Sequence, residues 1–222
     1  MQSTRECVYH LPARSDFPPS VPGIAREARG VFWCALSFIV LVCLAAEFAP
    51  RLAAALQLER GELAAGQWWR LLTCHFVHWN GDHLFWDLLA FVTLAVAAHR
   101  IDRRRLTPCL LVASVAIPIS VLWFQPTLQT YRGLSGLDTS LFALLAACLF
   151  RQQAAQQNWR GVLIVVILTG LLAAKTGFEL VTHDTLFVNA QQAGFQPVPL
   201  AHVIGAVVGL VTGALPQRPA RP

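Results

Sequence analysis

Ser135 and His202 are the two residues of this sequence whose types suit a nucleophile and its general base. A serine hydroxyl becomes nucleophilic when a neutral imidazole within hydrogen-bond distance accepts its proton. The oxyanion that develops on the attacked carbonyl group needs donors, which the backbone N–H of Ser135 and the imidazole of His83 can supply. Ser135 lies in a Gly-Leu-Ser-Gly segment at 133–136, whose glycines permit a tight turn and a close approach by another helix. These residues predict nucleophilic catalysis.

A metal site is the first alternative, because His75, His78 and His83 are near one another in the sequence and imidazoles can bind a catalytic zinc ion. No pair of them has the HExxH spacing of a zinc-binding helix, and no nearby glutamate is available as the base. The cysteines form no CxxC pair, and most lie in or beside apolar runs, where a free cysteine acts as a small hydrophobic residue. They are Cys7, Cys34, Cys43, Cys74, Cys109 and Cys148. We therefore predict no metal, no disulfide and no organic cofactor.

The composition predicts a membrane protein. Of the 222 residues, 55% are hydrophobic and 13% are charged, and the mean hydropathy is +0.52. A bilayer core of roughly 30 Å needs about 20 apolar helical residues, so a chain of this length can hold about six spans in contact with lipid. Six apolar runs fit this estimate: 31–49, 84–98, 106–124, 134–150, 162–180 and 198–215. We predict an all-α, six-helix membrane domain at 30–216, a poorly ordered tail at 1–29 and a short tail at 217–222.

The basic residues predict the orientation of these spans. Positive residues in short loops mark the cytoplasmic side, and most of them fall at alternate ends of the apolar runs. They are Arg26, Arg29, Arg100, Arg103, Arg104, Arg105, Arg151, Arg160, Arg218 and Arg221. The segment 182–199 has no Lys or Arg, whereas the first external loop has Arg51, Arg60 and Arg70 as a weaker opposing signal. Both termini should be cytoplasmic. Because the charges are scattered between apolar runs, the net charge of +5 does not predict nucleic-acid binding.

This orientation brings His83, Ser135 and His202 to the same end of the bundle, since the second, fourth and sixth spans would all begin on the external side. The fourth apolar run is short, at about 25 Å of helical rise, so Ser135 should lie below the surface. It would then need a water-filled cavity. The sixth span has small residues at every fourth position, which would permit close packing on the fourth. They are Ala201, Gly205, Gly209 and Gly213.

At this point the sequence resembles the rhomboid family of intramembrane serine proteases. The resemblance covers nearly all of the chain from Val31 onward and depends on short motifs in the family's order. They are Gly133 to Gly136 for GxSG, Ala201, His202, Gly205 and Gly209 for AHxxGxxxG, the Trp69-Arg70 pair for the external-loop WR, and His78 and His83 at the start of the second span.

The resemblance implies a serine endopeptidase that cuts proteins carrying a transmembrane segment, with no cofactor. Ser135 would be the nucleophile and His202 the general base, and His83 would bind the oxyanion. Lys175 and Glu179 in the fifth span look like those of the rhombosortase branch, whose members are thought to remove C-terminal sorting tails from exported proteins. That branch, with the small six-span form, implies a bacterial inner membrane and an active site open to the periplasm.

Asp87 departs from the family pattern, which has asparagine four residues after the second histidine. An asparagine can donate to an oxyanion, whereas an ionised carboxylate would repel it. Asp87 is therefore neutral, or it orients His83, or the chain has lost activity. In the last case the protein would bind client transmembrane helices without cutting them. A transporter is a further alternative, suggested only by Lys175 and Glu179, which stand one helical turn apart and are better explained by mutual neutralisation.

Overall fold

The structure is a computed structural model that describes residues 22–182 and 197–216. Residues 1–21 and 217–222 of the predicted tails, and most of the predicted external segment 182–199, lie outside the described residues. Helix α1 (Pro22–Phe48) begins within the predicted N-terminal tail, so residues 22–29 are helical. The chain divides into two units, residues 1–38 and 39–222, and the described part of the first unit is the opening of α1.

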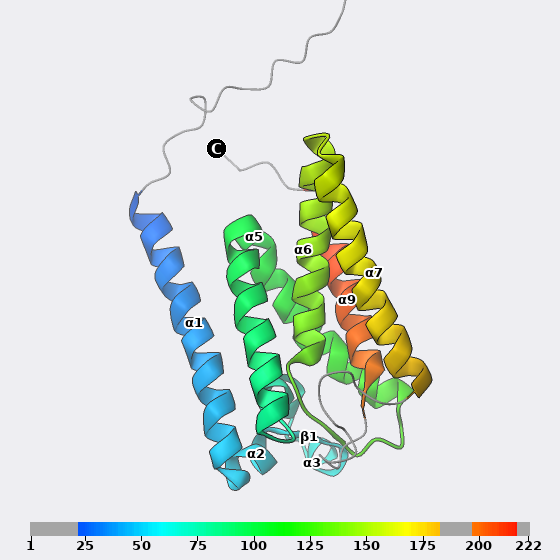
Figure 1. Ribbon diagram of the computed structural model, residues 1–222. Coiled ribbons are helices and arrows are strands. Elements are labelled where there is room, and N and C mark those ends of the chain that lie inside the picture. Colours follow the sequence, from blue (N-terminus) through cyan, green and yellow to red (C-terminus); the bar gives the residue numbers. More distant parts are fainter. Residues whose placement is uncertain (1–21, 183–196, 217–222) are drawn as a thin grey trace, which may run out of the picture. The chain divides into compact units, whose positions relative to one another are not determined.

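The second unit is helical, which confirms the all-α prediction apart from one short strand pair. Two-residue strands β1 (Leu58–Glu59) and β2 (Thr130–Tyr131) pair antiparallel, with Leu58 opposite Tyr131. The remaining elements are α2 (Pro50–Leu56), α3 (Arg60–Ala64), α4 (Arg70–Thr73), η2 (Cys74–Phe76), α5 (Gly81–Phe124), α6 (Ser135–Ala155), α7 (Trp159–Thr182) and α9 (Pro199–Ala214). In Figure 1, α6, α7 and α9 lie side by side.

Three described helices are long and apolar enough to cross a membrane: Gly30–Phe48, Gly81–Phe124 and Trp159–Thr182, with Pro199–Ala214 as a shorter apolar helix. Six crossings therefore stay a prediction. Helix α6 has 21 residues, or about 31 Å of rise. The helix continues through residues 151–155 beyond its apolar run, so the depth of Ser135 below the membrane surface stays a prediction.

Helix α5 contains two of the predicted runs, 84–98 and 106–124, on either side of a break at Asp102 (φ −150°, ψ 80°). Its first part places Asp87 against the backbone N–H of Leu134, and its second part places Ile117 beside Gly136. Both ends of α5 therefore meet the start of α6. At the break the chain turns back, so the two parts of α5 form a hairpin that supports the Gly-Leu-Ser-Gly segment from two sides (Figure 1).

Helices α6 and α9 pack at backbone contact distance. A methyl group on Gly205 would overlap the carbonyl oxygen of Gly136, and one on Gly209 would overlap that of Ser140. A methyl on Gly213 would meet the side chain of Ala147. Only glycine allows such an approach along a helix face. The predicted docking of the small-residue stripe on the fourth helix is thus confirmed, and it sets the position of His202 relative to Ser135.

Two arginines of the predicted first external loop bind backbone carbonyls. Arg60 donates from Nη2 to Leu122 and Gln125, both at 2.8 Å, and from Nε to Leu128 at 2.8 Å. Arg70 is 5% exposed and donates from Nη1 to Ala54 at 2.6 Å and to Gln57 at 2.7 Å. The last carbonyl groups of a helix have no hydrogen-bond donor within the helix, so they need donors such as these from elsewhere. Arg60 and Arg70, which opposed the predicted orientation, therefore have a local structural role.

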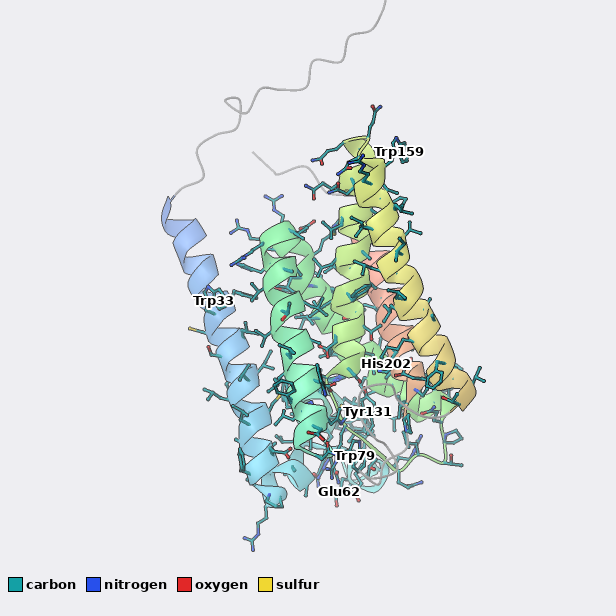
Figure 2. All side chains as sticks on the ribbon, in the orientation of Figure 1. Trp33, Glu62, Trp79, Tyr131, Trp159 and His202 are labelled. Carbon is teal, nitrogen blue, oxygen red and sulfur yellow. The ribbon has the colours of Figure 1, made fainter. Side chains whose placement is uncertain are left out.

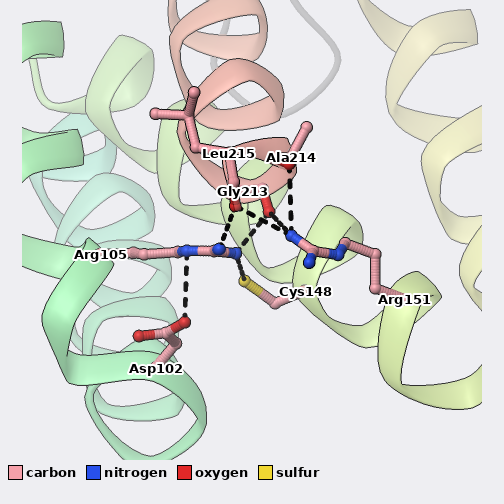
Figure 3. Close-up of polar contacts among 7 residues, drawn as sticks. All are labelled: Asp102, Arg105, Cys148, Arg151, Gly213, Ala214 and Leu215. Atoms are coloured by element: carbon pink, nitrogen blue, oxygen red, sulfur yellow. Dashed lines mark hydrogen bonds and ion pairs between the residues drawn. The ribbon is translucent and has the colours of Figure 1, made fainter. Parts of the chain in front are cut away.

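The helices of the second unit carry different polar residues at their two ends. Figure 2 shows Trp159 at one end of the helices, and Tyr131, Trp79 and His202 toward the other. At the end without the histidines, Arg105 and Arg151 donate to the last carbonyls of α9, and Asp102 lies 3.4 Å from Nε of Arg105 (Figure 3). Cations suit the negative end of a helix dipole. These arginines therefore cap the C-terminus of α9, the helix whose first turn contains His202.

Candidate active site

A single cavity of about 550 Å³ brings together residues from α5, α6, α7 and α9. Ser135 and His202 both line it, as do His83 and Asp87. The labelled side chains of Tyr131, Trp79 and His202 in Figure 2 mark the end of the molecule at which it lies. The structure thus brings together the nucleophile, the base and one oxyanion donor predicted from the sequence.

Ser135 is the first residue of α6 and is partly exposed. Its N-cap residue, Leu134, provides no side-chain hydrogen bond to the helix. The first backbone N–H groups of a helix have no acceptor within it, and they carry the positive end of its dipole. The start of α6 therefore presents amide donors, including that of Ser135, where an oxyanion would form.

Gly133 holds the turn that leads into this helix. Its φ of +118° is a conformation that other residues rarely adopt, and an added Cβ would lie 3.2 Å from Cε1 of His83. The buried His75 supports the same turn, with Nδ1 3.3 Å from the carbonyl oxygen of Gly133 and Nε2 3.0 Å from that of Ser114. Burial lowers the pKa of His75, which favours a neutral imidazole that donates to one of these two carbonyl oxygens at a time.

His202, in the first turn of α9, has Nδ1 2.7 Å from Oε2 of Glu179. Nδ1 is therefore engaged, and Nε2 is the ring nitrogen left for a proton from serine. In the described part of the chain, no hydrogen bond joins the Ser135 hydroxyl to His202. Catalytic hydrogen bonds are often long in the absence of substrate and shorten in the complex. Ser135 and His202 therefore line the same cavity, and their hydrogen bond would have to form when a substrate binds.

Asp87 faces two histidines through one carboxylate oxygen. Its Oδ2 lies 3.3 Å from Nε2 of His78 and 3.2 Å from Nε2 of His83, and it accepts a 3.0 Å hydrogen bond from the backbone N–H of Leu134. An oxygen that accepts from one backbone N–H and lies within 3.3 Å of two imidazole nitrogens suits an ionised carboxylate, which accepts only. Of the three interpretations of Asp87, these distances favour the one in which the carboxylate orients His83.

Asp87→Asn is expected to lower kcat/KM about tenfold. The asparagine oxygen can still accept from Leu134, but the charge-assisted contacts with two imidazoles are lost, and such bonds are worth about 1.5–3 kcal/mol. Cleavage kinetics measure the effect. The control is Asp82→Asn, because Asp82 is an exposed carboxylate in the first turn of the same helix. Activity at or above that of the parent would instead indicate that the carboxylate hinders oxyanion binding.

The other motif residues lie around the cavity rather than in it. Trp69 donates from Nε1 to the carbonyl of Ala55 at 3.2 Å, and Arg70 ties α4 to the C-terminal end of α2. The buried His78 accepts a 3.2 Å hydrogen bond from Arg132 at its backbone carbonyl. Gly205 and Gly209 lie in the contact between α6 and α9. These residues hold the loops and helices that frame the site.

Two cavity residues were missed as site residues in the sequence. Glu179 contacts His202, and Asp138 lines the cavity at 8% exposure with an Oδ1 atom that has no hydrogen-bond partner among the described residues. The signals were present. Asp138 is three residues after Ser135 and so shares its helix face, and Glu179 lies near the end of the fifth apolar run, level with the predicted starts of the fourth and sixth.

Comparison with models of known protein families gives a match. The family model for the Rhomboid domain matches residues 65–218, which is more than half of the chain. The matched part runs from the loop before Trp69 to the end of α9 and includes the cavity-lining residues of all four helices. No curated protein matches the chain.

Proposed function

Since this chain belongs to the rhomboid family of intramembrane serine proteases, we propose that it is an active endopeptidase with Ser135 as its nucleophile and His202 as its general base. The observation that carries the proposal is the shared cavity, in which a hydroxyl at the start of α6 and an imidazole at the start of α9 face the same space. The substrates would be proteins with a transmembrane segment, as for rhomboid proteases in general.

The chemistry follows from these positions. Nε2 of His202 takes the proton of the Ser135 hydroxyl, and the oxygen attacks the substrate's carbonyl carbon. The backbone N–H of Ser135 stabilises the oxyanion, and His83 adds a second donor when both of its ring nitrogens carry protons, because Nε2 faces Asp87. The protonated His202 then gives its proton to the leaving amine, and a water molecule hydrolyses the acyl-enzyme with His202 again as the base. A cavity of about 550 Å³ has room for that water and an unwound length of substrate.

The membrane arrangement is part of the proposal. Six crossings, with both termini in the cytoplasm, would place the cavity near the external face, because α5, α6 and α9 all begin at the end of the helices that contains it. A substrate helix must unwind to expose its peptide bonds, which is tolerated only where the backbone is buried in protein or wetted. Removal of C-terminal sorting tails of exported proteins at a bacterial inner membrane, as in the rhombosortase branch, is the narrower proposal.

The test uses the purified full-length protein in liposomes with a fusion protein that carries one transmembrane segment. We expect cleavage within or beside that segment, located by mass spectrometry of the products. A serine-reactive phosphonofluoridate should label Ser135 at the same time. Labelling of another serine with Ser135 unmodified would contradict the assignment of the nucleophile.

A protein that binds client helices without cutting them is the second candidate. Two observations favour it: the Ser135 hydroxyl and His202 form no hydrogen bond with each other in the described structure, and Asp87 occupies the position of the family's asparagine. Binding of the fusion protein with neither cleavage nor labelling would support this candidate and contradict the protease.

A further inference from the structure

Glu179 is a buried carboxylate at the centre of a charged cluster in an apolar helix. It is 1% exposed, and its two oxygens have different partners. Oε1 lies 2.5 Å from Nζ of Lys175, and Oε2 lies 2.7 Å from Nδ1 of His202 on α9. A buried charge is costly unless it is paired and hydrogen-bonded. Pairing with Lys175 alone would occupy one oxygen, so the second contact calls for its own explanation.

The contact determines which nitrogen of His202 can act as a base. A carboxylate oxygen only accepts, so Nδ1 must carry the proton that it shares with Glu179. In a neutral imidazole the lone pair is then on Nε2, the nitrogen available to serine. Rotation of the ring would break the 2.7 Å contact. The carboxylate thus selects both the tautomer and the orientation of His202.

Lys175 accounts for the charge of this arrangement. Its ammonium group balances Glu179 while His202 is neutral, so the resting cluster carries no net charge. When His202 takes the serine proton, the imidazolium lies against a carboxylate already in place, and the transition state needs no reorganisation to stabilise it. Other titratable groups around the cavity are Asp138 from α6, His83 and Asp87 from α5, and Tyr131 and Arg132 from the segment before α6. Among the described residues, Glu179 is the carboxylate that contacts His202, and Asp138 and Asp87 form no hydrogen bond or ion pair with it.

We propose that Glu179 is a positioning residue of the active site, which makes the Ser135–His202 pair a serine–histidine–glutamate triad with Lys175 as the counter-ion of the glutamate. This inference rests on the proposed protease function. It assigns the pair in α7 to the reaction, and it replaces the simpler interpretation in which Lys175 and Glu179 only neutralise each other.

Glu179→Gln is the first test, in the liposome cleavage assay. Glutamine has nearly the same shape but can present an N–H to Nδ1, which would favour the wrong tautomer. We expect kcat to fall about a hundredfold or more, since the equivalent change in a serine protease triad costs roughly ten-thousandfold, while KM changes less than about threefold. Phosphonofluoridate labelling of Ser135 should slow in parallel. Glu179→Asp, which keeps the carboxylate, should recover part of kcat.

The double variant Lys175→Met/Glu179→Gln separates positioning from charge balance. If Glu179 served only to neutralise Lys175, removal of both charges would restore activity. If Glu179 acts through His202, the double variant stays as slow as Glu179→Gln. Lys175→Met alone should then have the highest kcat of these three variants. Thermal unfolding of each variant in detergent shows whether it is folded, and the Glu179→Asp comparison remains decisive if Glu179→Gln is not.

Two results would overturn the inference in different ways. Glu179→Gln with the kcat of the parent, or a double variant restored to parent activity, would remove Glu179 from the mechanism and leave the proposed protease intact. A parent protein that neither cleaves nor labels would remove the proposed function and the triad together.

Discussion

Ser135→Ala is expected to reduce peptide-bond cleavage to background, a fall of roughly ten-thousandfold or more in kcat. The methyl side chain cannot form the acyl-enzyme, and the other groups around the cavity can only bind and polarise the substrate. His202→Ala should fall to a similar level, because the hydroxyl then has no base and residues that act as a unit give non-additive losses. Initial rates in liposomes at several substrate concentrations measure both effects.

Ser140→Ala is the matched control for this prediction. Ser140 is on the same helix and fully buried, and its hydroxyl donates to the backbone carbonyl of Leu137 rather than facing the cavity. The variant should keep the parent rate. Parent-like cleavage by Ser135→Ala would show that another group attacks the substrate. If Ser140→Ala lost as much cleavage as Ser135→Ala, the loss would reflect damage to α6. Phosphonofluoridate labelling of Ser135 in the parent protein would then test the nucleophile.

Gly209→Leu is expected to separate α9 from α6. Any Cβ at this position overlaps the carbonyl oxygen of Ser140 and crowds the side chain of Ala143. A backbone oxygen cannot move aside as the end of a flexible side chain can. Overpacking of this kind costs about 3 kcal/mol, and a protein of this size loses about 2–4 °C in Tm per kcal/mol. We expect Tm in detergent to fall by about 10 °C and cleavage to be lost, since α9 carries His202.

Gly170→Leu provides the comparison. Gly170 is also a helical glycine in an apolar helix, but nothing lies within 4 Å of a Cβ built there and the position is exposed. Its replacement should leave Tm and cleavage close to the parent values, because leucine has the higher helix propensity. A Tm for Gly209→Leu equal to that of Gly170→Leu would contradict the close packing of α6 on α9.

Several features of the site could be predicted from the sequence because they depend on order and spacing along the chain. Apolar runs predicted helices, and the four-residue spacing of Gly205, Gly209 and Gly213 predicted a smooth face that packs on another helix. Ser135 and His202 were assigned to a common end because their segments would begin on the same side. The structure brings them to one cavity.

Other features were decided by the tertiary structure. Lys175 and Glu179 are a helical turn apart, so their pairing could be predicted, but the second oxygen of Glu179 meets His202 only because α7 packs beside α9 at one particular rotation. Asp87 likewise meets His78 through the loop before α5, and not through helical spacing. Spacing determines which residues share a face of one helix. Which faces meet depends on side-chain packing between segments distant in sequence, and the partners of buried charges in this protein were therefore set by the fold.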